Sequence, residues 1–385
     1  MEIEYTAPQG VRDVIASLGR TEDVRFSPSN RRLAVAAFTR NRIVVFDIDI
    51  AAAATGHRVA LRGGVDLSSP ALKSPHGLDF IDDDTLVVSN REGDVGIFKL
   101  PAGDIDVQRC EALPIQTLPA DGTSLLKSPG SVSIVDVDRD LCEMLICNNF
   151  EHTVTRHVLD RTAGCAVRSS EVLLRKWLDI PDGVGVRRDR RWLAVSNHNT
   201  HSVLLYEYVP SLNRDADPDG ILRGVYYPHG LRFSSDGRHV FVADAGAPYV
   251  HVYRTDGDEW RGVRNPVATI RIMDESQFLR GRHYPDEGGP KGLDIDAGSN
   301  VLVVTSECQP LAFFDVPAMR DGELHERFQR EQRALEVRYE LYILEQDHLT
   351  EARARKAKTL LDYMTNSKSW RITAPFRRLH SPWRR

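Results

Sequence analysis

Apolar and polar residues alternate along most of the chain in short runs separated by turns, and this pattern predicts β-strands. A typical unit starts with a Pro-x-Gly turn and an alternating strand such as LRF, followed by a polar turn and a more apolar strand such as VFVA. A third alternating strand ends the unit. The pattern occurs six times, and its copies begin at Thr21, Pro75, Pro129, Pro181, Pro228 and Pro290.

A further β-rich stretch lies between consecutive copies, for example HRVALRG or VATIRIM, so that each unit holds four strands in 47 to 62 residues. Such units are typical of propeller blades. The sixth copy lacks its fourth strand, and the segment GVRDVIASLG at residues 10–19 is predicted to supply it. Residues 1–318 are therefore predicted to form an all-β six-bladed β-propeller, with an N-terminal strand that closes the last blade.

The pattern changes after Pro317, where residues 319–365 become rich in Glu, Arg, Leu and Ala. This segment predicts a long α-helix, and apolar residues such as Phe328, Leu335 and Tyr339 give it an apolar stripe. We expect the stripe to form a coiled coil that makes the protein a homo-oligomer. Packing along the propeller and packing on another protein are the alternatives.

Residues 366–385 form a basic tail, with six Lys or Arg and no acid. The formal net charge of −5 therefore combines +6 in the tail with −11 elsewhere. Cations between aromatic rings suit the surface of an anionic membrane. The tail residues predicted to contact a membrane or a partner are Trp370, Arg371, Arg377, Arg378 and Trp383. A disordered tail without a partner is the alternative, and we expect no nucleic-acid ligand.

The composition, 41% hydrophobic and 27% charged residues, is that of a soluble globular protein and excludes collagen-like and mucin-like classes. No apolar run approaches the roughly 18 residues of a membrane span, and the N-terminus does not resemble a secretory signal. Five cysteines without metal-ligand spacing are expected to be reduced thiols. These features predict a cytoplasmic protein, with the tail placing it at the inner face of the membrane.

Candidate chemistry comes from the second residue of each copy, which should point toward the central axis of a propeller. This first ring consists of Glu22, His76, Gly130, Asp182, His229 and Lys291. Two imidazoles and two carboxylates, from Glu22, His76, Asp182 and His229, are a donor set for Zn, Fe or Mn. Asp182 or Glu22 could then act as a catalytic base. A ligand site without metal and a solvated rim are the alternatives.

A second set of polar residues lies near the end of the second strand of each copy, and its members are expected to cap turns. They are Ala37, Asn90, Asn149, Asn197, Asp244 and Ser306. The nearby His198 and His201 are expected to be exposed in a turn.

The polar insert at residues 277–292 precedes the last copy and could fold over the channel mouth. It would bring Arg280, Arg282, His283 and Tyr284 close to Lys291. Such a cluster suits an anionic ligand, for example a sugar acid or a phosphate. A solvated loop is the alternative.

Copies such as PHGLRFSSDGRHVFVADAGAPYVHVY resemble NHL-type and gluconolactonase-type six-bladed propellers. The resemblance implies a metal-ligating Glu in the first blade, which Glu22 matches. His76 and His229 lie in Pro-His-Gly-Leu turns, which resemble the zinc-binding turns of peptidylglycine amidating lyases. The lyase pattern has a third such His, which this chain lacks.

The tail resembles the Ser-x-Ser-Trp-Arg-x-Thr-x-Pro-x-Arg segment of bacterial glycosyltransferases and associated proteins of surface-polysaccharide assembly. The matching residues are Ser367, Ser369, Trp370, Arg371, Thr373, Pro375 and Arg377. The resemblance implies a place in that pathway and a glycosyltransferase as partner.

Two functions follow from these features. The first is a binding or scaffold protein of bacterial surface-glycan assembly, with a glycan or sugar-acid site at the channel mouth. The sequence favours it because no complete catalytic motif is present. The alternative is a metal-dependent lactonase-like hydrolase or lyase that acts on a sugar or sugar acid at the propeller axis.

Overall fold

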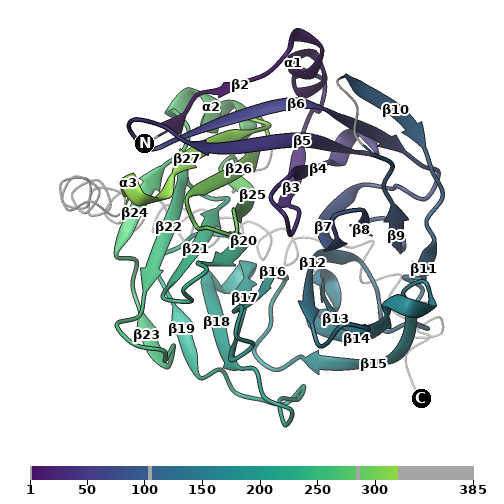
Figure 1. The fold of residues 1–385 in the computed structure, drawn as a ribbon. Helices are drawn as coiled ribbons and strands as arrows, with labels where there is room; N and C mark the ends of the chain where they lie inside the picture. The colour runs from purple at the N-terminus through teal and green to yellow at the C-terminus, as the bar shows by residue number, and fades with distance from the viewer. Residues whose placement is uncertain (1, 103–105, 283–286, 320–385) are drawn as a thin grey trace, which may run out of the picture. The chain divides into compact units, whose positions relative to one another are not determined.

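The computed structural model describes residues 2–102, 106–282 and 287–319, whose strands form six sheets around a common centre (Figure 1). The innermost strands begin where the repeat predicted them to begin. They are β3 (Thr21–Phe26), β7 (Pro75–Asp82), β12 (Pro129–Asp136), β16 (Pro181–Val186), β20 (Pro228–Phe233) and β25 (Pro290–Ile295). Neighbouring inner strands contact one another all the way round, including β25 with β3. The six-bladed propeller is thus confirmed.

Each blade continues outward from its inner strand by antiparallel pairing. Blades 1 and 2 continue with β4 (Arg32–Ala37), β5 (Arg42–Ala52) and β6 (His57–Ser68), and with β8 (Thr85–Asn90), β9 (Val95–Lys99) and β11 (Gln116–Leu118). Blades 3 and 4 continue with β13 (Leu141–Asn148), β14 (Thr153–Asp160) and β15 (Ala166–Leu174), and with β17 (Trp192–Asn197), β18 (Ser202–Glu207) and β19 (Gly220–Leu222). Blade 5 continues with β21 (His239–Asp244), β22 (Tyr249–Arg254) and β24 (Ala268–Arg271), and blade 6 with β26 (Val301–Ser306) and β27 (Ala312–Asp315).

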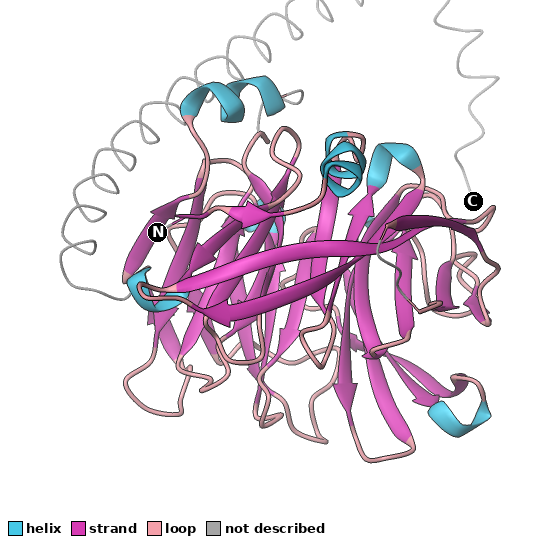
Figure 2. Ribbon diagram, turned by 45° about the horizontal axis from the view of Figure 1, so that its top comes forward, coloured by secondary structure: helices cyan, strands magenta, loops and turns pink. Residues whose placement is uncertain are grey.

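Shorter elements complete the described chain, and Figure 2 shows how strands dominate over helices. Two strands, β2 (Tyr5–Thr6) and β10 (Val107–Glu111), lie parallel to β6, and β23 (Gly262–Arg264) lies parallel to β19. The α-helices are α1 (Gln9–Ala16), α2 (Glu275–Gly281) and α3 (Val316–Met319). Single 3-10 turns follow β4, β13, β14 and β17, namely η1 (Phe38–Arg40), η2 (Asn149–Glu151), η3 (Arg161–Ala163) and η4 (His198–Thr200).

The N-terminus closes the last blade, but through a different segment from the one predicted. Strand β1 (Glu2–Ile3) pairs antiparallel with β27, and Ile3 lies opposite Phe313. Residues 10–19, predicted as this strand, instead contribute to helix α1. The prediction was wrong because Val11 and Ile15 lie four residues apart, so they share one helical face, on which both are buried.

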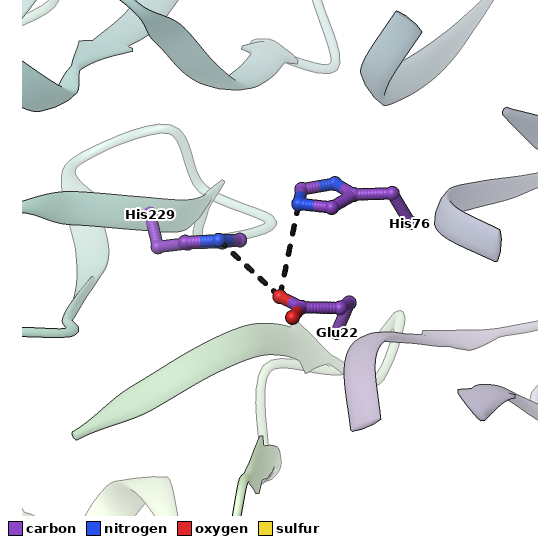
Figure 3. A group of neighbouring side chains, drawn as sticks. All are labelled: Glu22, His76 and His229. Atoms are coloured by element: carbon purple, nitrogen blue, oxygen red, sulfur yellow. Dashed lines mark ion pairs between the residues drawn. The ribbon is translucent and has the colours of Figure 1, made fainter. Parts of the chain in front are cut away.

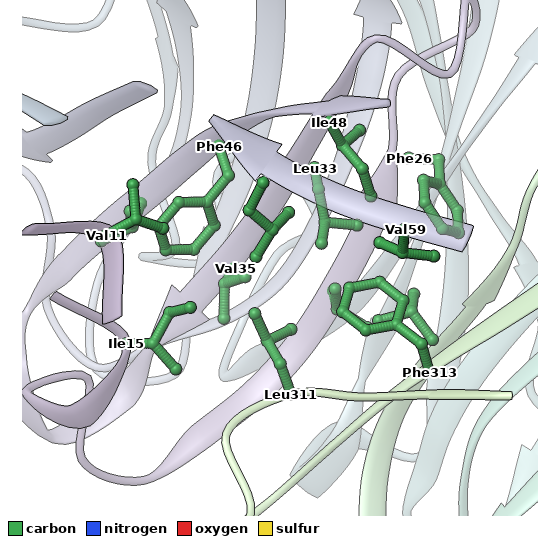
Figure 4. Close-up of a cluster of buried hydrophobic side chains, with 14 of the residues drawn as sticks. Val11, Ile15, Phe26, Leu33, Val35, Phe46, Ile48, Val59, Leu311 and Phe313 are labelled. Atoms are coloured by element: carbon green, nitrogen blue, oxygen red, sulfur yellow. The ribbon is translucent and has the colours of Figure 1, made fainter. Parts of the chain in front are cut away.

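The seam between blades 6 and 1 is filled by one apolar cluster (Figure 4). Side chains from the first and last described segments of the propeller meet there, since Val11 and Ile15 of α1 and Phe313 of β27 pack with Phe46 and Val59 of blade 1. Burial of aromatic and branched side chains is the main favourable term in closing such a ring. The cluster therefore joins the first and last blades although they are far apart in sequence.

The segments predicted as a long helix, residues 319–365, and as a basic tail, residues 366–385, lie outside the described residues apart from Met319 at the end of α3. The coiled coil, the oligomer and the membrane or partner contacts of the tail therefore stay predictions. Within the described part of the chain, no helix is long and apolar enough to cross a membrane.

Ile3→Ala is expected to lower the free energy of unfolding by about 2 kcal/mol, because a buried side chain of the closing strand is truncated. Urea denaturation of the full chain measures the change. Glu4→Ala, at an exposed position next to it, is the matched control and should stay within about 0.5 kcal/mol of the natural protein. Equal stability of the two variants would contradict closure through β1.

Candidate functional site

The Pro-x-Gly turns bring the first-ring residues together at one end of the channel. In all six inner strands, the register of pairing shifts within the first four residues, next to the ring position. A bulge of this kind re-aims a side chain out of the regular pleat. The glycine that follows permits the next blade to approach, since a Cβ on Gly183 would lie 2.1 Å from the carbonyl oxygen of His229.

Three first-ring residues form a compact group, shown in Figure 3: Glu22, His76 and His229. All three are buried, and their nearest ligand atoms lie within 4.8 Å of one another. The Oε2 atom of Glu22 lies 3.7 Å from Nε2 of His76 and 3.5 Å from Nε2 of His229. The two imidazole rings are stacked, with centroids 5.3 Å apart. The predicted ring is therefore a physical cluster.

The geometry of this group fits a divalent metal. Oε2 of Glu22 is buried and has no hydrogen-bond partner. Its distances of 3.5 and 3.7 Å to the imidazole nitrogens exceed hydrogen-bond range. They are close to the separation of about 3.3–3.5 Å expected for two ligands that each lie about 2.0–2.1 Å from one tetrahedral zinc ion. Two imidazoles and one carboxylate are also a common donor set for such an ion.

Asp182 borders the group on the side of blade 4. Its Oδ2 atom lies 3.0 Å from Nε2 of His229, and its Oδ1 atom lies 3.9 Å from Nε2 of His76. Asn149 donates a hydrogen bond of 2.6 Å to Asp182. The space for the Asn149 side chain comes from Gly130, where a Cβ would lie 2.0 Å from Oδ1 of Asn149. Because Gly130 has no side chain, the side chain of Asn149, from the turn after β13, takes its place in the ring.

Lys291 lies next to Glu22, as the sixth member of the ring. Its Nζ atom is 3.6 Å from Oε2 of Glu22 and 2.5 Å from Oε2 of Glu287. Arg20 pairs with the other carboxylate oxygen of Glu22 and lies 3.3 Å from Glu307. The site therefore carries its own buried counter-charges.

These neighbours set the ionisation of the carboxylates. Burial alone raises the pKa of Glu22, but the charges of Lys291 and Arg20 outweigh it and lower that pKa to about 2. Burial likewise opposes ionisation of Asp182, and its histidine neighbours and Arg91 hold its pKa well below the usual range. Both groups are therefore carboxylates at neutral pH, as metal ligation requires.

The histidines of the site differ in the direction in which their pKa is shifted. Burial lowers the pKa of His76 and of His229, so both imidazoles are neutral at pH 7. Neutral imidazole is the form that ligates metals. For His198, burial is outweighed by the hydrogen bond to Glu287 and by Asp182, and its pKa is raised.

His198 corrects the expectation that this turn exposes its imidazoles. It is buried, with Nε2 3.1 Å from Glu287 and Nδ1 3.8 Å from Asp182. His201, the other residue of that prediction, is half-buried, and its ring packs against Tyr226 and Tyr227. The composition of this turn could not show whether its side chains point to solvent or into the channel.

Several residues of the second predicted set cap turns, as expected. The carboxamide of Asn90 accepts from the backbone N–H of Lys73, and Asn197 and Asp244 accept in the same way from Asp179 and Tyr226. In blade 3 the capping residue is Asn148, which accepts from Lys127, and the predicted Asn149 instead contacts Asp182. The prediction missed by one position because two asparagines are adjacent.

The residues that follow the strand ends form a second ring next to the site. The sequence analysis did not identify this ring, and it assigned Asn149 to a turn cap and His198 to an exposed turn. Its members that contact the first ring or Arg20 are Phe38, Arg91, Asn149, His198 and Glu307. Arg91 donates a hydrogen bond of 2.5 Å to Nε2 of His76 and lies 3.6 Å from Asp182. Reading one residue beyond each strand end would have found this ring.

The insert before blade 6 is described in part, so the predicted anion cluster can be placed only in part. Arg280 is an exposed residue of helix α2 and donates to Ser276, while Arg282 is half-buried at the end of that helix. His283 and Tyr284 lie outside the described residues. The insert reaches the site through Glu287, which contacts His198 and Lys291. Among the described residues of the predicted anion cluster, Lys291 is the one that lies in the ring. Anion binding by these residues stays a prediction.

A second charged layer lies further along the inner strands. Arg25 is buried and contacts Asp23 at 2.6 Å, and Arg232 contacts Asp294 at 2.9 Å. Burial dominates in all three carboxyl groups of this layer, and it raises the pKa of Asp23 and Asp79 to about 7 and that of Asp294 to about 6. Three carboxyl groups therefore share two guanidinium partners inside the channel.

Comparison with solved structures supports the fold. The luciferin-regenerating enzyme aligns with a TM-score of 0.50 and 12% identity over 78% of this chain and 92% of that chain. A putative gluconolactonase aligns with a TM-score of 0.47 and 13% identity over 77% and 89%. A functionally unknown protein from Desulfotomaculum acetoxidans DSM 771 aligns with a TM-score of 0.41 and 11% identity over 70% of each chain. No protein-family model matches the chain, and no curated protein matches it in sequence.

The chain thus has a six-bladed propeller fold similar to that of the luciferin-regenerating enzyme. At 12% identity, this likeness concerns the fold alone. The function has to be argued from the site.

Between pH 4 and 7, the charged layer is expected to make the free energy of unfolding fall as the pH rises. Unfolded Asp ionises near pH 3.8, whereas folded Asp23 and Asp79 keep their protons up to about pH 7. Their contribution is therefore complete below pH 4 and lost by about pH 7. We expect a fall of several kcal/mol, since a pKa raised from 3.8 to about 7 corresponds to at most roughly 4 kcal/mol for each group. Glu22 acts oppositely and only at lower pH, since its pKa is lowered to about 2.

Urea denaturation at several pH values measures this slope, and Asp79→Asn should make it shallower by removing one titrating group. Asp49→Asn, at an exposed aspartate paired with Arg62, is the control and should leave the slope unchanged. The same slope in Asp79→Asn as in the natural protein would contradict the assignment to the buried layer.

Proposed function

We propose that the protein is a metal-dependent hydrolase or lyase that acts on a sugar or sugar acid at the mouth of the propeller channel. In this proposal, Glu22, His76 and His229 hold the metal. The observation that carries it is the buried Oε2 atom of Glu22, which has no hydrogen-bond partner and lies at ligand-to-ligand distance from two neutral imidazoles. This favours the enzymatic alternative of the sequence analysis over a binding scaffold.

The donor set suits Zn, Fe or Mn. When bound, such an ion would act as a Lewis acid on water or on a substrate oxygen. Lys291 and Arg20 keep Glu22 ionised before any metal arrives. A ligand that is already deprotonated binds a metal without releasing a proton.

Asp182 has a separate task in this arrangement. Sequence analysis offered Glu22 and Asp182 as candidate bases, and the geometry favours Glu22 as a ligand. Asp182 faces Nε2 of His229 at 3.0 Å, and the hydrogen bond from Asn149 fixes its carboxylate. It can therefore serve as a further ligand, since it lies at the nitrogen of His229 that faces Glu22 and not at the other ring nitrogen, where carboxylates that only orient a metal-binding histidine bind.

The surroundings of the group support a polar substrate. Charged or polar side chains border it on several sides, including Arg91, His198, Glu287 and Lys291. Because sugars and sugar acids offer hydroxyl and carboxylate oxygens, they can satisfy such groups where an apolar ligand would leave them unpaired. The luciferin-regenerating enzyme provides an example of an enzyme with this fold.

The scaffold function in surface-glycan assembly depends on the helix and the tail, which lie outside the described residues. It stays a prediction, as do the glycosyltransferase partner and the cytoplasmic, membrane-peripheral location.

Metal analysis of the purified full chain tests the proposal, together with titration calorimetry with Zn²⁺ and Mn²⁺ after chelation. We expect about one ion per chain, and at least a tenfold loss of affinity in His76→Ala and in His229→Ala, because each removes one of three protein ligands. Hydrolysis of a panel of sugar lactones should require the ion and fall to background in both variants.

His152→Gln is the matched control, because this half-exposed histidine lies outside the group of three. Its metal affinity should equal that of the natural protein. A natural protein that binds neither ion, or site variants that bind it as well as the control does, would remove the metal from the proposal.

A further inference from the structure

A groove lies over blade 2, close to the proposed metal site. Its volume is about 680 Å³, within the range of small-molecule sites. Three segments line it: the loop that leads into β7, the turn between β8 and β9, and the loop that leads into β12. Arg91 belongs to the lining and also contacts His76, so the groove and the axial group share one side chain.

The lining carries equal numbers of cations and acids. The charged residues are Lys73, Arg91, Lys127, Glu92, Asp94 and Asp121. Two of the acids are fixed by the loop that leads into β12, since Asp94 accepts from the backbone N–H of Ala120 and Asp121 accepts from that of Thr123. Lys127 also pairs with Glu151 at 2.5 Å.

This balance selects the chemistry of the occupant. A bare anion would meet three carboxylates, and an apolar ligand would desolvate six charged groups. Sugar hydroxyls both donate and accept hydrogen bonds, so they can use cations and acids in turn. A carboxylate at one end would find Arg91, whose guanidinium can bind it with two parallel hydrogen bonds.

Arg91 also forms a hydrogen bond with Nε2 of His76, the atom that would ligate the metal. A guanidinium can only donate, so Nε2 of His76 must accept the bond of 2.5 Å with its lone pair. The same lone pair is the one that would ligate the ion at the group formed with Glu22 and His229. One lone pair cannot do both, so a metal can bind His76 through Nε2 only after Arg91 has moved away.

We propose that the groove over blade 2 binds a sugar acid, and that Arg91 couples its binding to metal binding at the axial group. A carboxylate in the groove draws Arg91 from His76 and so frees a ligand for the metal. The coupling is reciprocal, so each ligand tightens the binding of the other by the same factor. This inference rests on the proposed metal site, but the groove itself does not.

The test uses the full chain, Mn²⁺ as the metal and D-gluconate as the groove ligand, with titration calorimetry as the readout. A titration of Mn²⁺ into gluconate alone corrects for direct complexation. We expect saturating gluconate to tighten Mn²⁺ binding at least threefold, and Mn²⁺ to tighten gluconate binding equally.

Two variants separate the parts of the inference. Lys73→Gln combined with Lys127→Gln should weaken gluconate binding to the metal-free protein at least tenfold. Arg91→Gln should tighten Mn²⁺ binding without gluconate, because the guanidinium no longer occupies His76, and should abolish the coupling. Lys176→Gln, at the exposed lysine of the loop that leads into β16, is the matched control and should behave like the natural protein.

The outcomes are distinguishable. Equal gluconate affinity in the double variant and the control would overturn the groove as the binding site. Weaker Mn²⁺ binding in Arg91→Gln, or a coupling that survives in it, would overturn the role of Arg91. Failure of the natural protein to bind Mn²⁺ or Zn²⁺ would overturn the proposed metal site and the coupling together, while gluconate binding to the metal-free protein would still decide the groove.

Discussion

The close approach of neighbouring inner strands at the Pro-x-Gly turns is the constraint on which the site depends. A Cβ on Gly77 would lie 2.4 Å from the carbonyl oxygen of Gly130, and one on Gly230 would lie 2.7 Å from that of Lys291. Because each glycine has no side chain, the backbone of the ring residue in the next blade can pack directly against it. Because this happens in successive blades, residues as distant in sequence as Glu22 and Lys291 come within ion-pair distance.

The repeat made most of the fold predictable. Alternating strands after each turn are short-range signals, and they located all six inner strands to the residue. The closing strand was harder, because β1 has only two residues and no pattern of its own, whereas the segment after it alternates weakly. Burial of Val11 and Ile15 against another blade decided its conformation, and such tertiary contacts are invisible in a local pattern.

The first ring was predictable for the same reason as the strands, since its members occupy one repeat position. The second ring was not recognised, although its residues also occupy one repeat position, directly after the strand end that pairs with the first residue of the inner strand. In blade 3 two adjacent asparagines, Asn148 and Asn149, hid which of them ends the strand. Arg91 and His198 had a signal in their position after the strand end but none in composition, and their contacts with His76 and Asp182 show that their turns face the channel.

The electrostatics of the mouth explain why it can be charged and buried at once. Burying Glu22 and Asp182 without partners would cost several kcal/mol each. Lys291, Arg20 and Arg91 remove that cost by lying next to them, so the cations belong to the folded apoprotein. A divalent ion must consequently compete with these side chains for the same donors. Lys291 can give up its ion pair with Glu22 readily, since its ammonium group also pairs with Glu287 at 2.5 Å. Arg91 can leave His76 only if its guanidinium finds another acceptor. Metal binding at the axial group therefore depends on the ligand in the groove over blade 2.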